Sequence, residues 1–555
     1  MKRAILFVTL LLMAAGYAFL QTPSPAPKLA TLMPGGALLY LEAPDFGGLL
    51  RDWDKSAVKK DWLASANYEV FSRSSLFTKL QEVYTQYGQA AGFLPGLKSV
   101  IEIAGTDSAL ALYQIRDVEF LYITHISDAS LMKSQLWALR DKFEQRQAGG
   151  TAFYLRTDPA SKRTVAFAFV KGYLVLATRD DLVAQSLELL AGGSSPSVAA
   201  DSWYRDATAA AQTPGELRLV MNLEALVKSV YFRSYWVQRN VSLVHQYWAG
   251  IADAKRSEGN ITETRVFLKT EPTAPSGTVS GLLALVPPEA GLYKASLAGT
   301  PSEVAALIVG KLIGSQSQRA RDWRDAPEEV SPDTTAGNEG DLETRIDEQP
   351  LPADTGIADS IDSVRGLIEK TGGRGVLLVQ SSASVAGTFI HLPSAIVIDG
   401  SQDWQPDAVR DSLGIAAGKL WTTAKLGAGW VTETSGPHTM QRMDGLGTLF
   451  LANRGPLLFL GNDLPLLASL LDRAGTSQPV RTLSYAAGFR HSRERSNYQS
   501  VMTALDFTSP AGAPAFFSRN IGSVSHVLSG LTEVDIRQEE RANLTVQTVD
   551  YTMAR

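Results

Sequence analysis

The chain has 555 residues, a hydrophobic content of 45% and a formal net charge of -5 at pH 7. A length prior of about 150 residues per domain predicts several domains. With no cysteine, the chain has no disulfide, thiol nucleophile or thiolate metal site, and without a basic excess nucleic acid is not expected as a partner.

The N-terminal segment has the pattern of an export signal. Lys2 and Arg3 precede an apolar run from Ala4 to Leu20, and small residues at Gly16 and Ala18 fit a peptidase site. A retained anchor is the alternative, because a spanning helix needs about 17–25 apolar residues. We expect residues 1–20 to be a signal peptide or anchor and 21–30 a Pro-rich linker. The rest then lies in the bacterial periplasm or on the periplasmic face of the inner membrane, touching the membrane only through an uncleaved segment.

The stretch "VAFAFVKGYLVLATRDDLVAQSLELLAGG", Val165 to Gly193, predicts a strand, a tight turn, a second strand and a helix. Lys171-Gly172 marks the turn. Asp180 or Asp181 is the expected helix N-cap, and Gly192 the expected end of the helix. The same order returns at "LGTLFLANRGPLLFLGNDLPLLASLLDRAG", Leu446 to Gly475.

Other blocks recur in the same order and predict a duplicated domain. The matching pairs are 32–40 with 285–293, 120–128 with 395–403, and 239–268 with 519–552; each segment of the last pair predicts an amphipathic helix, a polar turn and an alternating strand. Strands with one polar face suit antiparallel sheets whose other face is covered. The expected fold class is therefore α+β, with two tandem related domains at 31–272 and 277–555, each a mainly antiparallel sheet covered by helices.

A large insertion distinguishes the second half. Residues 315–356 are acidic, contain proline and have few aliphatic side chains. Such a composition cannot bury enough apolar surface to offset the loss of chain entropy. We expect a disordered acidic insertion inside the second domain.

The opening "LMPGGALLYLEAPDFGGLLRDW", together with "LKSVIEIAGTDSALALYQ" and "FAFVKGYLVLATRDDLVAQSLELL", resembles bacterial exported proteins grouped as DUF3352. The resemblance covers most of the first half and less of the second. That family has no characterised activity, so the resemblance implies a place in the cell envelope and no reaction.

One pair of short motifs bears on catalysis. Ser56 and Lys59 form an S-x-x-K spacing, and Lys370-Thr371-Gly372 forms a K-T-G, which together are typical of serine β-lactamases and penicillin-binding proteins. However, Lys370-Thr371-Gly372 closes a helical pattern, where a cation and a glycine fit a helix end, whereas the enzyme motif needs a strand. We interpret Ser56 as a solvated serine near a helix start.

An aromatic segment is the candidate binding surface. It contains Tyr231, Phe232, Tyr235, Trp236, Val244, Tyr247 and Trp248 on what the pattern predicts as one helical run. One interpretation is burial between the sheet and the other half. The other is a wall of an apolar pocket or a surface for a partner.

Three functions follow from these patterns. The leading one is a non-catalytic exported envelope protein acting as a scaffold or interaction module. The second is a carrier or sensor of an apolar ligand, and the third is a serine hydrolase or acyltransferase using Ser56 and Lys59. The expected partner is another envelope protein or an apolar ligand. No cofactor is expected, and none of the 6 histidines has the spacing of a metal motif.

Overall fold

The structure is a computed structural model. It describes residues 28–211, 214–234, 240–274, 277–314, 358–381, 392–420, 429–445, 447–475, 482–507 and 515–554. The N-terminal segment, most of the linker and the acidic insertion at 315–356 lie outside the described residues. Tyr235 and Trp236 lie outside them as well.

The first half of the described chain contributes ten strands. They are β1 (Leu39–Ala43), β2 (Thr106–Gln114), β3 (Glu119–His125), β4 (Glu144–Ala148), β5 (Thr151–Thr157), β6 (Thr164–Val170), β7 (Tyr173–Ala177), β8 (Leu217–Met221), β9 (Tyr247–Ser257) and β10 (Asn260–Lys269). All pairings are antiparallel, in the order β4-β5-β6-β7-β3-β2-β1-β8-β9-β10.

The second half repeats this arrangement strand for strand. Its strands are β11 (Ala290–Leu297), β12 (Gly373–Ser381), β13 (Ser394–Gly400), β14 (Trp430–Ser435), β15 (His438–Asp444), β16 (Thr448–Arg454), β17 (Leu457–Gly461), β18 (Tyr485–Phe489), β19 (Leu531–Glu540) and β20 (Leu544–Met553). Their order is β14-β15-β16-β17-β13-β12-β11-β18-β19-β20. The predicted α+β class and the two related units are therefore confirmed.

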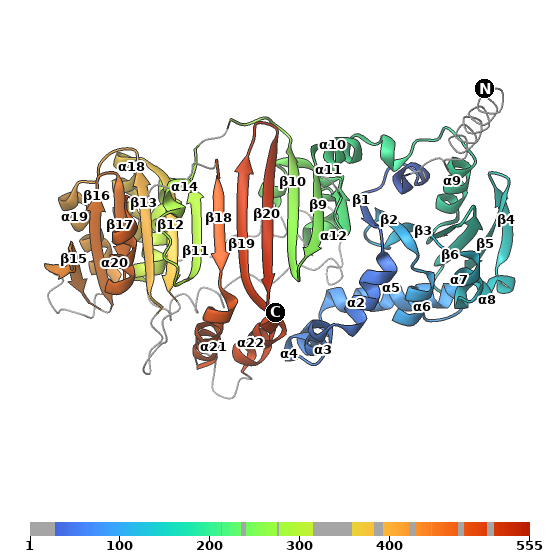
Figure 1. Cartoon of the computed structure of the whole chain (residues 1–555), viewed down its shortest axis with the longest axis horizontal. Coiled ribbons are helices and arrows are strands. Elements are labelled where there is room, and N and C mark those ends of the chain that lie inside the picture. Colours follow the sequence, from blue (N-terminus) through green and yellow to red (C-terminus); the bar gives the residue numbers. More distant parts are fainter. Residues whose placement is uncertain are drawn as a thin grey trace, which may run out of the picture.

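The two halves share one sheet. Strands β10 and β20 hold the same place in their halves and pair antiparallel, from Ile261 opposite Tyr551 to Leu268 opposite Leu544. A continuous sheet of twenty strands results within the described residues, and Figure 1 shows it running along the length of the molecule. Equivalent strands that pair antiparallel relate the halves by an approximate two-fold axis, near Thr264 and Thr548. Only β4 and β14 lack a described neighbour on one side.

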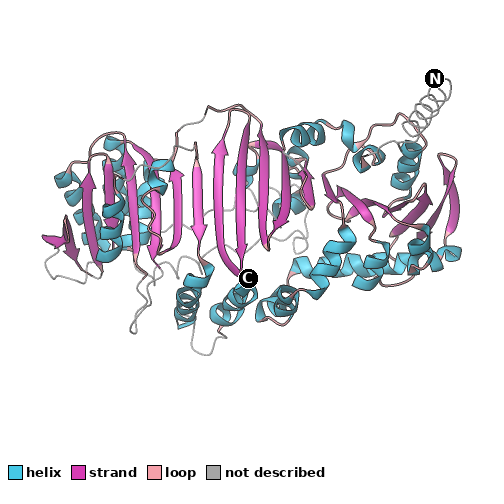
Figure 2. Ribbon diagram, in the orientation of Figure 1, coloured by secondary structure: helices cyan, strands magenta, loops and turns pink. Residues whose placement is uncertain are grey.

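Helices cover both faces of the sheet in the first half (Figure 2). Between β1 and β2 lie α2 (Phe46–Lys55), α3 (Ala57–Leu63), α4 (Ala66–Phe71), α5 (Ser75–Ala91) and α6 (Leu97–Ile103), and between β3 and β4 lie α7 (Asp128–Met132) and α8 (Gln135–Ala138). This layer packs on Val165, Phe167 and Leu174 of the sheet. The opposite face, with Ala166 and Val175, packs against α9 (Asp180–Leu190) and α10 (Ser202–Ala210).

The second half uses the same places for its helices. On one face lie α15 (Pro301–Ile308), α18 (Ala358–Thr371) and α19 (Pro406–Leu420), packed on Val376, Leu378, Ile396 and Ile398. On the other lie α14 (Ser280–Leu283) and α20 (Leu464–Arg473). Two further helices, α21 (His491–Phe507) and α22 (Gly522–Val527), lie between β18 and β19.

The repeated strand–turn–strand–helix unit forms in both halves. Lys171 and Gly172 both have positive φ, 52° and 80°, as the two central residues of a type I′ hairpin turn require. Asp463 caps α20, because its Oδ1 accepts the Leu466 N–H at 2.9 Å. The expected cap at Asp180 or Asp181 is wrong: Arg179 is the N-cap residue of α9. Asp181 instead forms an ion pair with Arg179.

Over 239–268 the predicted polar turn and alternating strand are confirmed, but the predicted amphipathic helix is wrong. Only α13 (Val241–Val244) is helical there, and β9 begins at Tyr247. Glu258 and Gly259, at φ 51° and 85°, turn the chain into β10, so the segment is mainly a hairpin. The matching segment 519–552 likewise ends in the β19–β20 hairpin. Both hairpins lie in the middle of the sheet, where two neighbouring strands satisfy their main-chain groups.

Candidate functional site

The candidate site is an apolar cavity of about 300 Å³ in the first half. It lies between the sheet strands β2, β3, β6 and β7 and the helical layer formed by α2, α5, α6 and α8. The lining residues are Phe46, Tyr87, Ala91, Phe93, Pro95, Ser99, Val100, Ile103, Leu110, Phe120, Tyr122, Leu136, Val165, Leu176, Ala177 and Thr178. None of them is charged.

Local features of the chain hold the helical wall in place. Helix α5 ends at Gly92, whose φ of 84° lets the chain turn back across the cavity. The Tyr84 hydroxyl donates to the Pro95 carbonyl oxygen at 2.8 Å and so fixes the lining loop. Gly88 leaves room for Leu94, because a Cβ on Gly88 would lie 2.5 Å from the Leu94 Cδ2. The wall of the cavity is thus set by the end of α5 and the loop that follows.

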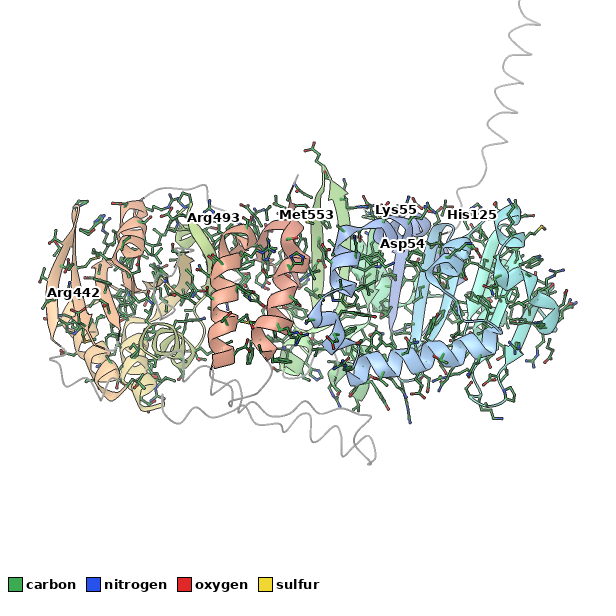
Figure 3. The ribbon with its side chains drawn as sticks, turned by 90° about the horizontal axis from the view of Figure 1, so that it is seen from below. Asp54, Lys55, His125, Arg442, Arg493 and Met553 are labelled. Atoms are coloured by element: carbon green, nitrogen blue, oxygen red, sulfur yellow. The ribbon has the colours of Figure 1, made fainter. Side chains whose placement is uncertain are left out.

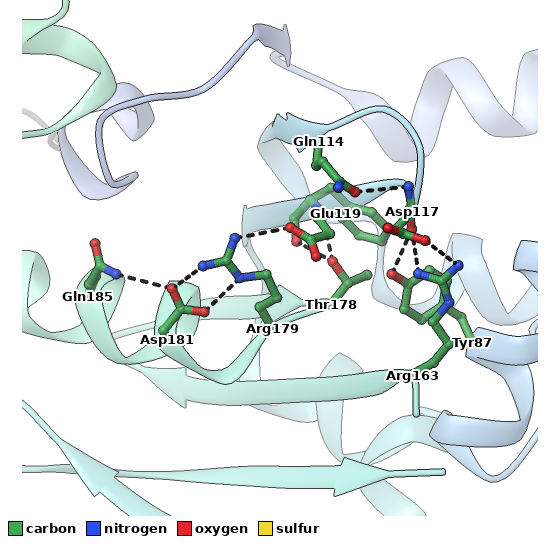
Figure 4. Close-up of polar contacts among 10 residues, drawn as sticks. Tyr87, Gln114, Asp117, Glu119, Arg163, Thr178, Arg179, Asp181 and Gln185 are labelled. Atoms are coloured by element: carbon green, nitrogen blue, oxygen red, sulfur yellow. Dashed lines mark hydrogen bonds and ion pairs between the residues drawn. The ribbon is translucent and has the colours of Figure 1, made fainter. Parts of the chain in front are cut away.

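The hydroxyl groups of Tyr87, Tyr122 and Thr178 in the lining are hydrogen-bonded to groups outside the cavity or to the main chain. The Tyr87 hydroxyl donates to the Asp117 carbonyl oxygen at 3.0 Å, and the Tyr122 hydroxyl donates to the Ser108 Oγ at 3.1 Å. The Thr178 Oγ1 accepts the Phe120 N–H at 2.8 Å (Figure 4). These three hydroxyl groups therefore add no free hydrogen-bond donor to the cavity.

No charged residue lines the cavity. Charged side chains lie close to its lining residues Tyr87 and Thr178 (Figure 4). The Arg163 guanidinium lies over the Tyr87 ring, 5.2 Å from its centroid, and binds the Asp117 carboxylate at 3.1 Å. Arg179 binds Glu119 at 3.0 Å. Burial raises the pKa of the Tyr87 hydroxyl above its ordinary value, so this group stays neutral at physiological pH.

The same layer in the second half is packed. Its helices α15, α18 and α19 bury large side chains such as Ile308, Leu367, Ile368 and Leu413, each 7% exposed or less, and Trp404 fills the space beside them. In the first half, α3, α4 and α6 contain no fully buried residue, and α5 buries only Val83, Gly88, Ala90 and Ala91. Two copies of one module thus differ in the packing of one helical layer.

Two other hollows are polar. One, of about 600 Å³, lies by the start of α2, where Arg256 binds Asp52 at 2.8 Å and Glu216 at 2.6 Å. The other, of about 550 Å³, lies between α21 and α22. Apart from Lys255, the charged groups that line the first hollow are in ion pairs with one another, and neither hollow encloses an apolar space.

A serine and a histidine meet beside the second polar hollow. The Ser525 Oγ lies 3.1 Å from the His491 Nε2, and the His491 Nδ1 lies 3.1 Å from the Leu531 carbonyl oxygen. Both side chains are buried, at 6% and 5% exposure. We interpret the pair as a packing contact that joins α21, α22 and the start of β19.

The predicted aromatic surface is not gathered into one site. Tyr231 and Phe232 lie in the short helix α12 (Val230–Phe232), and Val244 ends α13. Tyr247 and Trp248 are neighbours on β9, so their side chains point to opposite faces. The Tyr247 hydroxyl lies 3.2 Å from the Thr545 Oγ1 of β20, whereas Trp248 packs on the core of the first half. None of these residues lines the cavity.

The motif residues for serine chemistry make local contacts within their own segments. The Ser56 Oγ accepts the Lys59 N–H at 3.2 Å as the N-cap of α3, and it donates to the Trp53 carbonyl oxygen. The Lys59 Nζ binds Asp54 at 2.7 Å. Lys370 lies in the last turn of α18, and Gly372 follows with φ 71°. The predicted helix end is confirmed.

The described residues contain no group of three His, Asp or Glu side chains placed to hold a metal ion. Nor does this part of the chain include a helix with the length and apolar content needed to cross a membrane.

Comparisons with known proteins give little further information. No protein-family model and no curated protein matches the chain. Two solved structures, crystal forms I and III of TP0453, are similar to it at TM-scores of 0.25 and 0.26 and sequence identities of 11% and 12%. Each match covers 45% of this chain, and 82% and 83% of the other chains. TM-scores this low do not establish a shared fold, and the resemblance to DUF3352 stays a prediction.

Proposed function

We propose that this protein is a non-catalytic binding protein for an apolar ligand, held in the cavity of the first half. The observation that carries this proposal is the difference between the two copies. In the second half the described helices of this layer bury large side chains against the sheet, whereas in the first half the same layer leaves about 300 Å³ lined by uncharged side chains. A void of that size lowers stability through lost contacts, so a ligand that fills it stabilises the protein.

The size and chemistry of the cavity define the ligand class. An engineered apolar cavity of about 150 Å³ stays dry and binds benzene, and the present cavity, of about 300 Å³, is larger. Its lining offers aromatic rings at Phe46, Phe93 and Phe120, and no charged group. The ligand is therefore a single hydrocarbon chain or a small ring system, with any charged group outside the cavity.

The apolar-ligand carrier was the second function expected from the sequence, but its proposed binding site is now a different one. The ligand carrier takes the place of a pure scaffold, and its cavity replaces the aromatic segment at 231–248. The proposed location is still the periplasm or the periplasmic face of the inner membrane, based on Lys2, Arg3 and the apolar run after them.

The test is titration of the purified protein with N-phenyl-1-naphthylamine, a neutral dye whose fluorescence rises in apolar surroundings. We expect the wild-type protein to bind it, and Val100→Phe to bind at least about tenfold more weakly, because even one added methylene changes binding in an apolar pocket by about that factor. Val100 lines the cavity on α6. Unfolding midpoints show whether the variant stays folded.

The matched control is Val70→Phe, the same substitution on α4 of the same layer, at a side chain that is 41% exposed and does not line the cavity. It should bind the dye as the wild type does. Absence of dye binding by the wild type, or equal binding by Val100→Phe and Val70→Phe, would contradict the proposal.

A further inference from the structure

The outer side of the helical layer carries exposed apolar side chains. Leu80 and Tyr84 are one turn apart on α5 and are 47% and 38% exposed, and Leu94, in the loop after α5, is 58% exposed. We call these three residues the outer stripe. The stripe is continuous with the cavity, because Leu94 lies between the lining residues Phe93 and Pro95.

Three neighbouring helices add to this surface. Trp53 on α2, Leu63 on α3 and Val70 on α4 are 43%, 44% and 41% exposed. In Figure 1 these helices lie below the sheet, and Figure 3 shows the molecule from below. Exposed large apolar side chains grouped on one layer mark an interaction surface.

Side-chain hydrogen bonds cap the helices of this layer, and α3 and α4 contain no fully buried residue. The helices α3, α4 and α5 each begin with a serine N-cap: Ser56, Ser65 and Ser74 accept the N–H groups of Lys59, Tyr68 and Phe77. Short, capped, amphipathic helices with half-buried apolar faces suit a surface that can leave water and enter the apolar part of a membrane.

The exposed charges of the layer that have no ion pair are all positive. Most exposed charged residues of α2 to α6 are in ion pairs, such as Arg73 with Glu69 at 2.7 Å and Arg256 with Asp52 at 2.8 Å. Among the described exposed side chains of these helices, those with no ion pair are Lys55, Lys60 and Lys98. Lys55 is labelled in Figure 3. Lys55 and Lys60 share α2 and α3 with the exposed Trp53 and Leu63, and lysines without an ion pair on such a layer complement an anionic lipid surface.

We propose that this layer docks on an anionic lipid bilayer and that the apolar ligand enters the cavity from that bilayer through the loop that contains Leu94. The inference rests on the proposed function, since a ligand that fits the cavity is poorly soluble in water and is stored in membranes. It adds a second membrane contact to the N-terminal segment, which was the only one expected from the sequence.

The test is flotation of the full-length protein with phosphatidylcholine vesicles that contain or lack phosphatidylglycerol. We expect binding to the anionic vesicles that decreases as salt is added. The double variant Leu80→Ser/Leu94→Ser should bind at least about tenfold more weakly, because serine lacks the free energy that leucine gains on transfer from water to an apolar phase. Lys55→Glu/Lys60→Glu should lose the preference for phosphatidylglycerol.

The matched control is Ile415→Ser/Val431→Ser, two side chains of the second half that are 54% and 47% exposed. This variant also keeps the N-terminal segment, so any flotation that depends on that segment is the same in all proteins. Wild-type flotation of Leu80→Ser/Leu94→Ser, or equal binding to both vesicle types, would overturn the inference. Concentration-dependent dimerisation that Leu80→Ser/Leu94→Ser abolishes, without vesicle binding, would instead assign the surface to a second copy.

Failure of this inference can be told apart from failure of the proposed function. The single variant Leu80→Ser should still bind N-phenyl-1-naphthylamine in solution, because Leu80 does not line the cavity and lies outside the loop after α5 that forms its wall. Val100→Phe should float with vesicles as the wild type does but should not bind the dye. Loss of dye binding by the wild type with vesicle binding intact would refute the cavity proposal and leave only the surface.

Discussion

A single buried carboxyl shows how one residue sets a pH dependence. Glu494 on α21 is 8% exposed; its Oε2 accepts the Asn497 amide N–H at 3.3 Å, and its Oε1 has no hydrogen-bond partner among the described residues. Burial raises the pKa of the Glu494 carboxyl, and the hydrogen bond from Asn497 lowers it in part. The folded protein therefore holds a proton on Glu494 at a pH where the unfolded chain has lost it.

The prediction is that Glu494→Gln stabilises the protein at neutral pH. A carboxyl whose pKa is raised by folding destabilises the folded state above that pKa, and the penalty disappears below the unfolded value. We expect a gain of about 1 kcal/mol or more at neutral pH, the cost of an unpaired buried polar group. The gain should shrink toward zero as the pH falls to the ordinary pKa of a glutamate.

Urea unfolding of wild type and variant at several pH values checks this. Glu224→Gln, at an exposed ion pair with Lys228, should change stability by less than about 0.5 kcal/mol. An equal effect of Glu494→Gln at all pH values would contradict the account.

At the scale of elements, the same helical layer is packed differently in the two halves. The helices between the first and second strands of each half occupy equivalent places, but α18 buries Val364, Leu367 and Ile368, whereas α6 has no fully buried residue. The same strand order can therefore carry either a densely packed helical layer or a layer with a cavity.

A pair of truncations tests this difference. Leu413→Ala on α19, at a side chain 1% exposed, should cost about 2–5 kcal/mol of unfolding free energy because it opens a new void. Ile103→Ala on α6 removes as many carbon atoms but enlarges an existing cavity, so we expect less than half of that cost. Urea unfolding followed by tryptophan fluorescence measures both, and equal costs would contradict the assignment of a hollow layer.

The elements also show how far the sequence predicts the structure. The hairpin at Lys171-Gly172 and the helix caps at Asp463 and Gly192 were predictable because local chemistry dictates them. Tyr247 and Trp248 were assigned to a helix, although Glu258-Gly259 marks a hairpin, because apolar spacing there fits both periods. The cavity was not predictable: its lining comes from elements between Phe46 and Thr178, and a void depends on tertiary packing that no local pattern records.

At the scale of the whole molecule, the two halves meet as two copies of one chain would meet in a symmetric dimer. Equivalent strands β10 and β20 pair about Thr264 and Thr548. A two-fold contact of this kind is self-complementary, so a duplication keeps it without a new surface. The continuous sheet then fixes the relation between the packed half and the hollow half.

The absence of cysteine allows a direct test of this pairing. Thr264→Cys/Thr548→Cys should form an intramolecular disulfide on mild oxidation, because the two residues are cross-strand partners. Migration on a gel without reductant reports the bond. The control Thr264→Cys/Thr552→Cys places the second thiol four residues further along β20, about 13 Å away, and should remain reduced. A covalent dimer from the first pair would show that β10 pairs with β20 of another copy.

The two outermost strands determine how the molecules behave when they are crowded. An unpaired edge strand can form main-chain hydrogen bonds with a strand of another molecule and so start fibril formation. At one end, β4 presents Glu144, Gln145, Arg146 and Gln147, all exposed, and alternating charge resists such recruitment. At the other end, β14 exposes Val431 at 47% and carries fewer charges. Of the two edge strands of the described sheet, we therefore expect β14 to be the one at which ordered aggregation starts.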